Sequence, residues 1–315
     1  MSLLRTVWTQ TQRILKINDK MVNDKMVNYF TVADFLFGIE ANEQVLACLT
    51  NYAPFLTPVT GNPSPLFVIH MHDEAMPSTE GWEHVYTDKS DDDMPRIEMY
   101  QNQEGWMFRI SMYRDTEVVS TMVCKADWSE VQLYTSTTYA RFAIDNAAML
   151  VYAFATADKK TLLFHSSVTM LNGKGHMFLG HSGTGKSTHS QQWMKAFQEA
   201  ELLNDDNPVV RILEDSVRVY GSPWSGKTPC YKNASAPVAA LVQLAQAPEN
   251  KIAQLRMTQA YPYILASVSG LKVLPEMMDR LYESIAELLE RVPVYKLECL
   301  PNVEAAQLCA QTCSL

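Results

Sequence analysis

The stretch that decides the fold is Gly-His-Ser-Gly-Thr-Gly-Lys-Ser-Thr, at residues 180–188. It matches the phosphate-binding pattern G-x-x-x-x-G-K-[ST], in which backbone N–H groups turn inward around phosphate oxygens. In such a loop the lysine reaches the β- and γ-phosphates, and the serine hydroxyl takes a place on Mg²⁺. Glycine makes up only 12 of the 315 residues, so a chance match is rarer here than in an average chain. The alternative is a glycine-rich turn without a ligand.

The loop predicts binding of ATP and Mg²⁺. The residues after it, 188–200, form an expected helix whose positive N-terminal dipole would face the same phosphates. The candidate nucleotide-binding residues are Gly180, Ser182, Gly183, Thr184, Gly185, Lys186, Ser187 and Thr188.

The residues before the loop predict an antiparallel hairpin. Residues 161–171 are apolar and β-branched enough for a strand, and residues 175–180 form a second strand that enters the loop. Between them Asn172 and Gly173 form the strongest short hairpin signal. Ordinary mononucleotide-binding domains reach their loop by a βαβ crossover in a parallel sheet, so the sequence indicates a different lineage.

Two acidic residues follow the loop at a distance along the chain that would bring them back beside it. A helix over residues 188–200 carries the chain about 20 Å from the loop at about 1.5 Å per residue. Residues 201–206, if extended at roughly 3.3 Å per residue, return by about the same distance. Asp205 and Asp206 would then lie beside the phosphates, one on Mg²⁺ and one accepting a proton from an attacking hydroxyl. We assign Ser187 and Asp206 to the metal; the alternative is a solvated turn over residues 204–208.

Together these features resemble the C-terminal domain of HPr kinase/phosphorylase and its relatives, over residues 136–260. That group is similar in its nucleotide site to ATP-dependent phosphoenolpyruvate carboxykinase. The resemblance implies that His165 matches a histidine on the preceding strand, and that one of the two aspartates is a general base. Thr188 departs from the family, which has an acidic residue there, and the family's later glycine-rich segment has no clear equivalent. We therefore carry over nucleotide binding and phosphoryl transfer, but neither HPr as substrate nor carboxykinase activity.

Residues 220–232, YGSPWSGKTPCYK, are a candidate substrate loop. Lys227 and Lys232 could reach a phosphate or an anionic substrate, and Lys227 is the better candidate because it lies in the tightest part of the loop. Trp224 could stack on a base or close a lid. The alternative is a surface loop with an anchoring tryptophan and two solvated lysines.

The histidines divide into three groups. His165 is expected to contact the γ-phosphate or a metal, although a lone strand histidine is more often a satisfied core group. His181 and His189 flank the loop and are expected to be exposed. His70 and His72 would share one face of a strand, which suggests a metal site, but spacing fixes no third ligand.

Composition agrees with a cytoplasmic enzyme. The formal charge is −9 and the basic residues are scattered, which argues against nucleic acid as a partner. No apolar run approaches the roughly 20 residues that span a bilayer, and the N-terminal residues are too polar for a secretory signal. The six cysteines contain no C-x-x-C pair, which favours free thiols in a reducing compartment.

We expect an α/β fold of the HPr kinase/phosphoenolpyruvate carboxykinase type, with a mixed sheet over residues 131–315 and a β-rich N-terminal domain over residues 1–130. The predicted activity is transfer of the γ-phosphoryl group of Mg-ATP to a hydroxyl acceptor, a small molecule or a protein, by a chain whose relatives often form homo-oligomers. The candidate catalytic residues are Asp205, Asp206, Lys186, His165 and Lys227. Two alternatives remain: an NTPase that uses water, and a nucleotide sensor without turnover.

Overall fold

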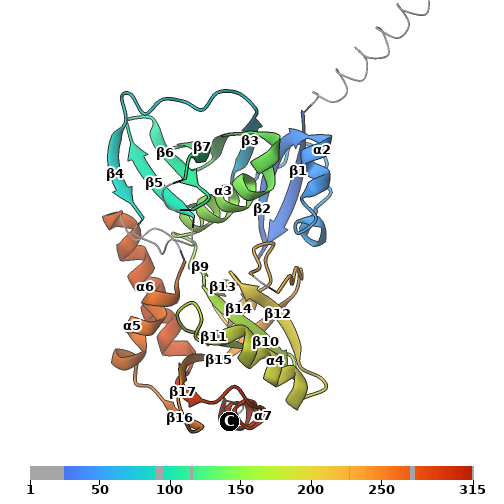
Figure 1. Cartoon of the computed structure of the whole chain (residues 1–315), viewed down its shortest axis with the longest axis vertical. Helices are drawn as coiled ribbons and strands as arrows, with labels where there is room; N and C mark the ends of the chain where they lie inside the picture. The colour runs from blue at the N-terminus through green and yellow to red at the C-terminus, as the bar shows by residue number, and fades with distance from the viewer. Residues whose placement is uncertain (1–24, 89–94, 114–115, 227, 270–273, 314–315) are drawn as a thin grey trace, which may run out of the picture. The chain divides into compact units, whose positions relative to one another are not determined.

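The computed structural model of the chain describes residues 25–88, 95–113, 116–226, 228–269 and 274–313. These form two compact units (Figure 1). The second unit begins at Met149, within helix α3 (Ala140–Ala155), and also takes in Thr31–Phe35 and Asn51–Phe55. The sequence indicated a boundary after residue 130.

In its described residues the first unit contains an eight-stranded sheet, in the order β1-β2-β3-β8-β7-β6-β5-β4. The strand β3 pairs in parallel with both β2 and β8, and β4 to β8 are joined as antiparallel neighbours. The short helix α2 (Glu43–Cys48) is capped by the Asn42 side chain, which accepts from the Val45 amide at 2.9 Å. The strand bounds are β1 Lys25–Val32, β2 Phe35–Asn42, β3 Val68–His72, β4 Glu83–Thr87, β5 Arg96–Gln101, β6 Gly105–Ser111, β7 Val118–Lys125 and β8 Glu130–Thr135.

The described part of the second unit contains a nine-stranded mixed sheet. Its central strands lie in the order β12-β10-β11-β15. The strand β15 also pairs with β17, which pairs with β16. The first residues of β15 pair with β14, and β13 and β9 follow β14 in the sheet. The strands β11, β15 and β17 are parallel, so their carboxyl ends meet at one edge. The bounds are β9 Thr161–Leu163, β10 Ser166–Leu171, β11 Lys174–Leu179, β12 Glu201–Asp206, β13 Val209–Ile212, β14 Val217–Tyr220, β15 Ser235–Gln246, β16 Lys251–Gln254 and β17 Val294–Cys299.

The hairpin before the loop is confirmed. The strands β10 and β11 pair antiparallel, from Ser166 opposite Leu179 to Leu171 opposite Lys174. Both turn residues have positive φ, 53° at Asn172 and 72° at Gly173, as a two-residue type I′ turn requires. The fold is therefore mixed α/β, with an antiparallel strand pair leading into residues 180–188.

Helices cover both faces of this sheet (Figure 1). Side chains alternate along β11, so Met177 and Leu179 join the core formed with α5 (Met257–Ser267) and α6 (Pro275–Arg291). Phe178 joins the opposite core, with α4 (Lys186–Ala196) and α7 (Val303–Cys313). The α4 helix, which follows the loop, is thus fixed by an apolar core of its own.

The anchor of α4 is Trp193, which is fully buried. Its Nε1 donates to His189 Nε2 at 3.0 Å, and its ring lies 4.6 Å from the ring of His176. His189 is only 3% exposed, so the expectation that it is exposed was wrong. The physical reason is that His189 lies one helical turn before the buried Trp193, so both side chains lie on the same inward face of α4.

Acid should destabilise this core. Burial lowers the pKa of His176 and of His189 to about 4. Unfolded histidine titrates near 6.5, so the unfolded chain binds more protons between pH 6.5 and 4. Stability is then complete above pH 6.5 and falls as the pH drops toward 4, by up to about 3 kcal/mol for each histidine.

Chemical denaturation at a series of pH values between 7.5 and 4.5 would measure this loss. The variant His176→Leu should lose about half of the histidine contribution. The variant His84→Leu, at an exposed position, should keep all of it. A free energy of unfolding that stays constant over the same range would contradict the prediction.

Candidate functional site

The loop connects the end of β11 to the first residue of α4. Gly183 and Gly185 have φ values of 78° and 102°, a left-handed conformation that side chains other than glycine adopt with strain. Gly185 is the N-cap of α4, so Lys186 and Ser187 form the first turn of the helix, two residues earlier than predicted. The first turn of a helix leaves its amides without intrahelical partners, and such amides are a common anion-binding site.

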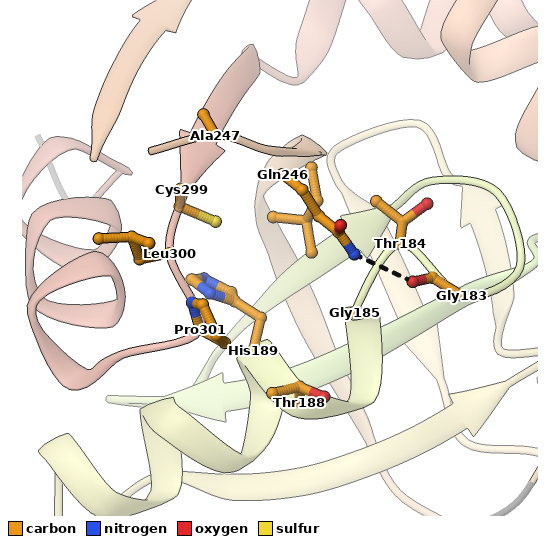
Figure 2. Close-up of a pocket in the computed structure, with 11 residues that line it drawn as sticks. Gly183, Thr184, Gly185, Thr188, His189, Gln246, Ala247, Cys299, Leu300 and Pro301 are labelled. Atoms are coloured by element: carbon orange, nitrogen blue, oxygen red, sulfur yellow. Dashed lines mark hydrogen bonds between the residues drawn. The ribbon is translucent and has the colours of Figure 1, made fainter. Parts of the chain in front are cut away.

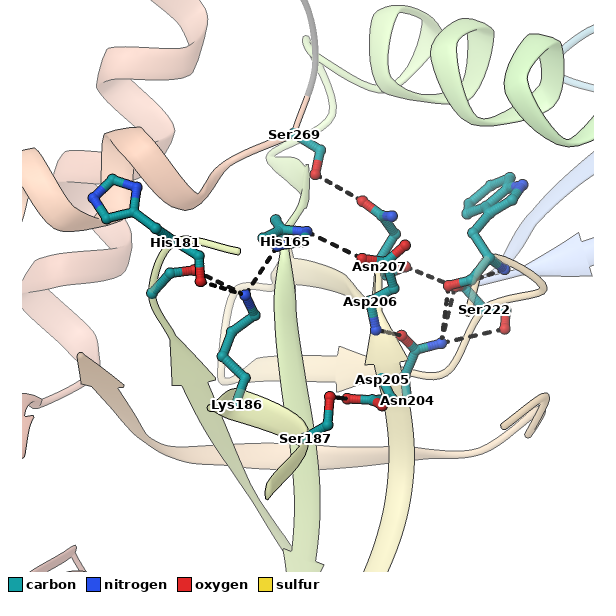
Figure 3. A network of polar contacts seen from close by, with 12 residues as sticks. His165, His181, Lys186, Ser187, Asn204, Asp205, Asp206, Asn207, Ser222 and Ser269 are labelled. Carbon is teal, nitrogen blue, oxygen red and sulfur yellow. Dashed lines mark hydrogen bonds and ion pairs between the residues drawn. The ribbon is translucent and has the colours of Figure 1, made fainter. Parts of the chain in front are cut away.

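Lys186 lies across the loop (Figure 3). Its Nζ donates to the carbonyl oxygens of Gly180 at 2.9 Å and His181 at 3.3 Å. Its third contact is with His165 Nε2 at 2.9 Å. Burial lowers the pKa of Lys186, although the nearby Asp206 and Asp205 oppose the shift. The ammonium group is therefore held against the loop by two backbone carbonyl oxygens and a histidine.

His165 links the lysine to a carboxylate. Its Nδ1 lies 3.0 Å from Asp206 Oδ1, while Nε2 accepts from Lys186. Because an ammonium only donates, the ring proton belongs on Nδ1, from which it is donated to Asp206. Lys186, His165 and Asp206, all candidate site residues from the sequence, thus form one chain of hydrogen bonds.

The strand that carries His165 is not continuous, contrary to the prediction for residues 161–171. It divides into β9 and β10 at residues 164 and 165. The first part pairs with β13 and the second with β11 and β12. The His165 amide instead donates to the Ser267 carbonyl at 2.7 Å. The histidine therefore lies at the point where the chain changes sheet partners.

The two aspartates end β12, which has the bounds expected from the sequence. They lie opposite Ser167 and Ser166 of β10, and a bulge at Leu203 precedes them. Adjacent residues of a strand point to opposite faces, so the two side chains have different partners. Asp205 Oδ1 accepts from Ser187 Oγ at 3.0 Å, whereas Asp206 contacts His165 (Figure 3).

Asp205 has the environment of a metal ligand. The residue is 5% exposed, and its Oδ2 has no hydrogen-bond partner within the part of the chain that the structure describes. A buried carboxylate oxygen without a partner is costly unless a cation or another donor satisfies it. Ser187 and Asp205 are hard oxygen donors of the kind that Mg²⁺ prefers. The sequence interpretation had placed Asp206 beside Ser187, and the geometry places Asp205 there.

The candidate substrate loop runs along β12. Ser225 forms an isolated bridge with Asp206, and the Gly226 amide donates to the Asp205 carbonyl at 2.9 Å. A Cβ at Gly226 would lie 2.8 Å from that same oxygen, so only glycine permits this approach. Lys232 pairs with Glu201 at 2.6 Å. Lys227, the candidate catalytic lysine, lies outside the described residues.

The sequence suggested that Trp224 could stack on a base or close a lid, but the side chain is buried. It is 5% exposed, its Nε1 donates to Tyr52 Oη at 3.3 Å, and its ring lies 5.2 Å from that of Tyr152. The backbone around it is held by Asn204, whose Nδ2 donates to the carbonyl oxygens of Ser222 at 3.3 Å and Trp224 at 3.4 Å. Trp224 is thus an anchor that fixes the segment beside the aspartates.

Replacing Trp224 by alanine should lower the free energy of unfolding by about 3–5 kcal/mol, since it empties a buried aromatic site. The variant Trp224→Phe retains most of the ring volume and should lose considerably less. Urea denaturation of the three proteins would measure both changes. Equal stability of the alanine variant and the natural protein would contradict the assignment of Trp224 as an anchor.

A pocket of about 540 Å³ opens on the other side of the loop (Figure 2). It adjoins the carboxyl ends of β15 and β17, and Gln246 Nε2 donates to the Gly183 carbonyl at 3.3 Å. The sequence predicted the loop side of this pocket and missed the rest, because residues 244–247 and 299–301 come from distant segments without a motif. The lining residues are Gly183, Thr184, Gly185, Thr188, His189, Leu244, Gln246, Ala247, Cys299, Leu300 and Pro301.

The histidine pair of the first unit has other partners. His70 Nδ1 lies 2.7 Å from Glu40 Oε2, and His72 Nε2 lies 2.7 Å from Gln132 Oε1. No cluster of three or more histidine, cysteine or acidic side chains suited to a metal occurs among the described residues. The metal site considered there has no structural support.

No protein-family model matches the chain, and no curated protein matches it. Among solved structures, it is similar to the Hpr(Ser) kinase/phosphatase from Coxiella burnetii, with 10% identity and a TM-score of 0.29. The match covers 47% of this chain and 86% of that chain. A likeness this limited carries no argument about activity. No described helix is long and apolar enough to cross a membrane.

Proposed function

We propose that the second unit binds Mg²⁺-ATP at residues 180–188 and transfers the γ-phosphoryl group to a hydroxyl acceptor. The observation that carries the proposal is the set of contacts at the loop: Lys186 with His165, His165 with Asp206, and Ser187 with Asp205. Three separate segments, the β9–β10 junction, the first turn of α4 and the end of β12, supply these residues to one place. We also assign the unit to the HPr kinase/phosphoenolpyruvate carboxykinase type, on the hairpin that feeds the loop and the order of these residues.

The phosphates are proposed to bind at the N-terminus of α4. Its first-turn amides donate, and the helix dipole favours negative charge. Lys186 is near enough to exchange its contacts with Gly180 and His181 for phosphate oxygens. Its positive charge would offset charge that develops on the transferred group.

The metal is proposed to bind at Ser187 and Asp205. The partnerless Oδ2 of Asp205 and the neighbouring hydroxyl of Ser187 fit a divalent cation with oxygen ligands. When bound, Mg²⁺ supplies neutralising charge to the β- and γ-phosphate oxygens.

Asp206 is proposed as the proton acceptor. Its carboxylate is partly exposed and is held by the Nδ1–H of His165, so it can receive the proton of an incoming hydroxyl. In the transfer, the acceptor oxygen forms a bond to the γ-phosphorus while ADP leaves, and the acceptor proton passes to Asp206. The proposed acceptor is a hydroxyl-bearing small molecule or protein.

The test is titration of the intact protein with Mg²⁺-ATP by calorimetry, followed by an assay for ADP release with and without hydroxyl acceptors. Binding with acceptor-dependent ADP release supports the proposal. Release at the same rate without any acceptor would make the protein an NTPase, and binding without release would make it a nucleotide sensor. Failure to bind any adenine or guanine nucleotide would overturn the proposal at its first step.

A further inference from the structure

The pocket beside the loop shares its residues with the proposed phosphate site. Gly183, Thr184 and Gly185 belong to the loop, and Thr188 belongs to the first turn of α4. A molecule in the pocket would therefore be in direct reach of phosphates held at the helix N-terminus. In Figure 2 the loop residues form one wall, and residues 299–301 form the opposite wall.

The pocket is chemically unlike the phosphate site. No Asp, Glu, Lys or Arg side chain is among its lining residues, and the Nε2 of its one histidine, His189, accepts a hydrogen bond from Trp193 Nε1. Leu244, Ala247, Leu300 and Pro301 give it an apolar surface. Such a pocket suits the uncharged end of a ligand whose anionic end lies in the loop.

The position and the volume of the pocket agree with a ligand whose uncharged end lies in the pocket and whose anionic end lies in the loop. Ligands of open α/β sheets bind beyond the carboxyl ends of parallel strands, where β15 and β17 end at Gln246 and Cys299. A volume of about 540 Å³ lies in the range of small-molecule sites. Because the Nε2 of Gln246 donates to Gly183, its Oε1 presents an acceptor, which suits an exocyclic amino group.

We propose that this pocket, lined by Leu244, Gln246, Ala247 and residues 299–301, holds the adenine base and ribose of the nucleotide whose phosphates bind the loop. The inference rests on the proposed function, since it concerns the same ligand. It assigns the base to the α4–α7 face of the sheet. His165 and the two aspartates then serve the phosphate end.

Comparison of Mg²⁺-ATP with inorganic tripolyphosphate tests the pocket separately from the loop. Tripolyphosphate presents the same chain of phosphates without base or ribose. The natural protein should bind ATP at least about tenfold more tightly than tripolyphosphate. The variant Ala247→Phe, which fills the pocket, should weaken ATP to the level of tripolyphosphate and leave tripolyphosphate unchanged. The matched control is Ala253→Phe, at an exposed position of β16, which should change neither.

A second measurement needs no variant. Cys299 is a free thiol in the pocket wall, and Cys48 is an exposed free thiol in the first unit. Alkylation of Cys299, followed by site-resolved mass spectrometry, should be slowed by ATP and not by tripolyphosphate. Alkylation of Cys48 should be unaffected by either ligand.

The outcomes separate the two proposals. Equal affinity for ATP and tripolyphosphate, with no effect of Ala247→Phe and no protection of Cys299, would overturn the base site and leave the phosphate site standing. Failure of both ligands to bind the natural protein would overturn the proposed function, and the base site with it.

Discussion

Replacing Lys186 by alanine should weaken the binding of Mg²⁺-ATP by about 100-fold, because charge-assisted hydrogen bonds to phosphate contribute most at a partly buried site. The Nζ atom lies within 3.3 Å of two loop carbonyls and of His165, so no other described ammonium group can replace it there without moving. The fold should survive. Alanine has the highest helix propensity, and the substitution removes an ammonium group whose pKa is lowered by burial. Calorimetry would give the affinity, and thermal denaturation would give the stability.

The matched control is Lys195→Ala. Lys195 belongs to the same helix but is exposed in its last turn, nine residues from Lys186. The Lys195→Ala variant should bind Mg²⁺-ATP with the same affinity as the natural protein. If both lysine variants lost affinity equally, net charge would explain the effect and the loop assignment would fail.

Replacing Asp206 by asparagine should lower turnover by about 10²–10⁴-fold, as expected for the loss of a general base. Nucleotide binding should remain nearly unchanged, because Asp206 contacts His165 and has no contact with Ser187. Single-turnover phosphoryl transfer and calorimetry on the same sample separate the two effects.

The neighbouring variant, Asp205→Asn, should behave differently. It replaces the buried oxygen proposed to bind Mg²⁺, so nucleotide affinity should lose its dependence on the metal. Asp215→Asn, at an exposed turn, serves as the control and should change neither property. If Asp205→Asn abolished turnover with metal dependence intact, and Asp206→Asn did the reverse, the roles would be exchanged, as the sequence interpretation first assigned them.

Elements beside the loop could be predicted because their signals are local. The turn signal at Asn172 and Gly173 gave the hairpin of β10 and β11, and residues 201–206 have the bounds of β12. The arithmetic of helix rise and strand rise brought Asp205 back to the loop, where Ser187 contacts it at 3.0 Å. These inferences needed only the distance along the chain.

The errors arise where the determining contact is distant in sequence. Nothing within residues 161–171 indicates that the chain changes partners at His165, because β13 and β12 follow some 40 residues later. Trp224 finds Tyr52 across 172 residues. The burial of His189 depends on α7, which begins at Val303, because α4 packs against it through Trp193 and His189 lies on the same helix face.

The alternation of β12 imposes a parity rule on this part of the chain. Asp205 and Asp206 are chemically identical, and only their odd or even position along the strand gives one to Ser187 and the other to His165. If the strand absorbed a one-residue insertion between α4 and β12 by sliding, Asn204 would take the place beside Ser187 and Asp205 the place beside His165. The carboxylate beside the hydroxyl would then be lost, so the length of the connection before β12 sets which side chain faces Ser187.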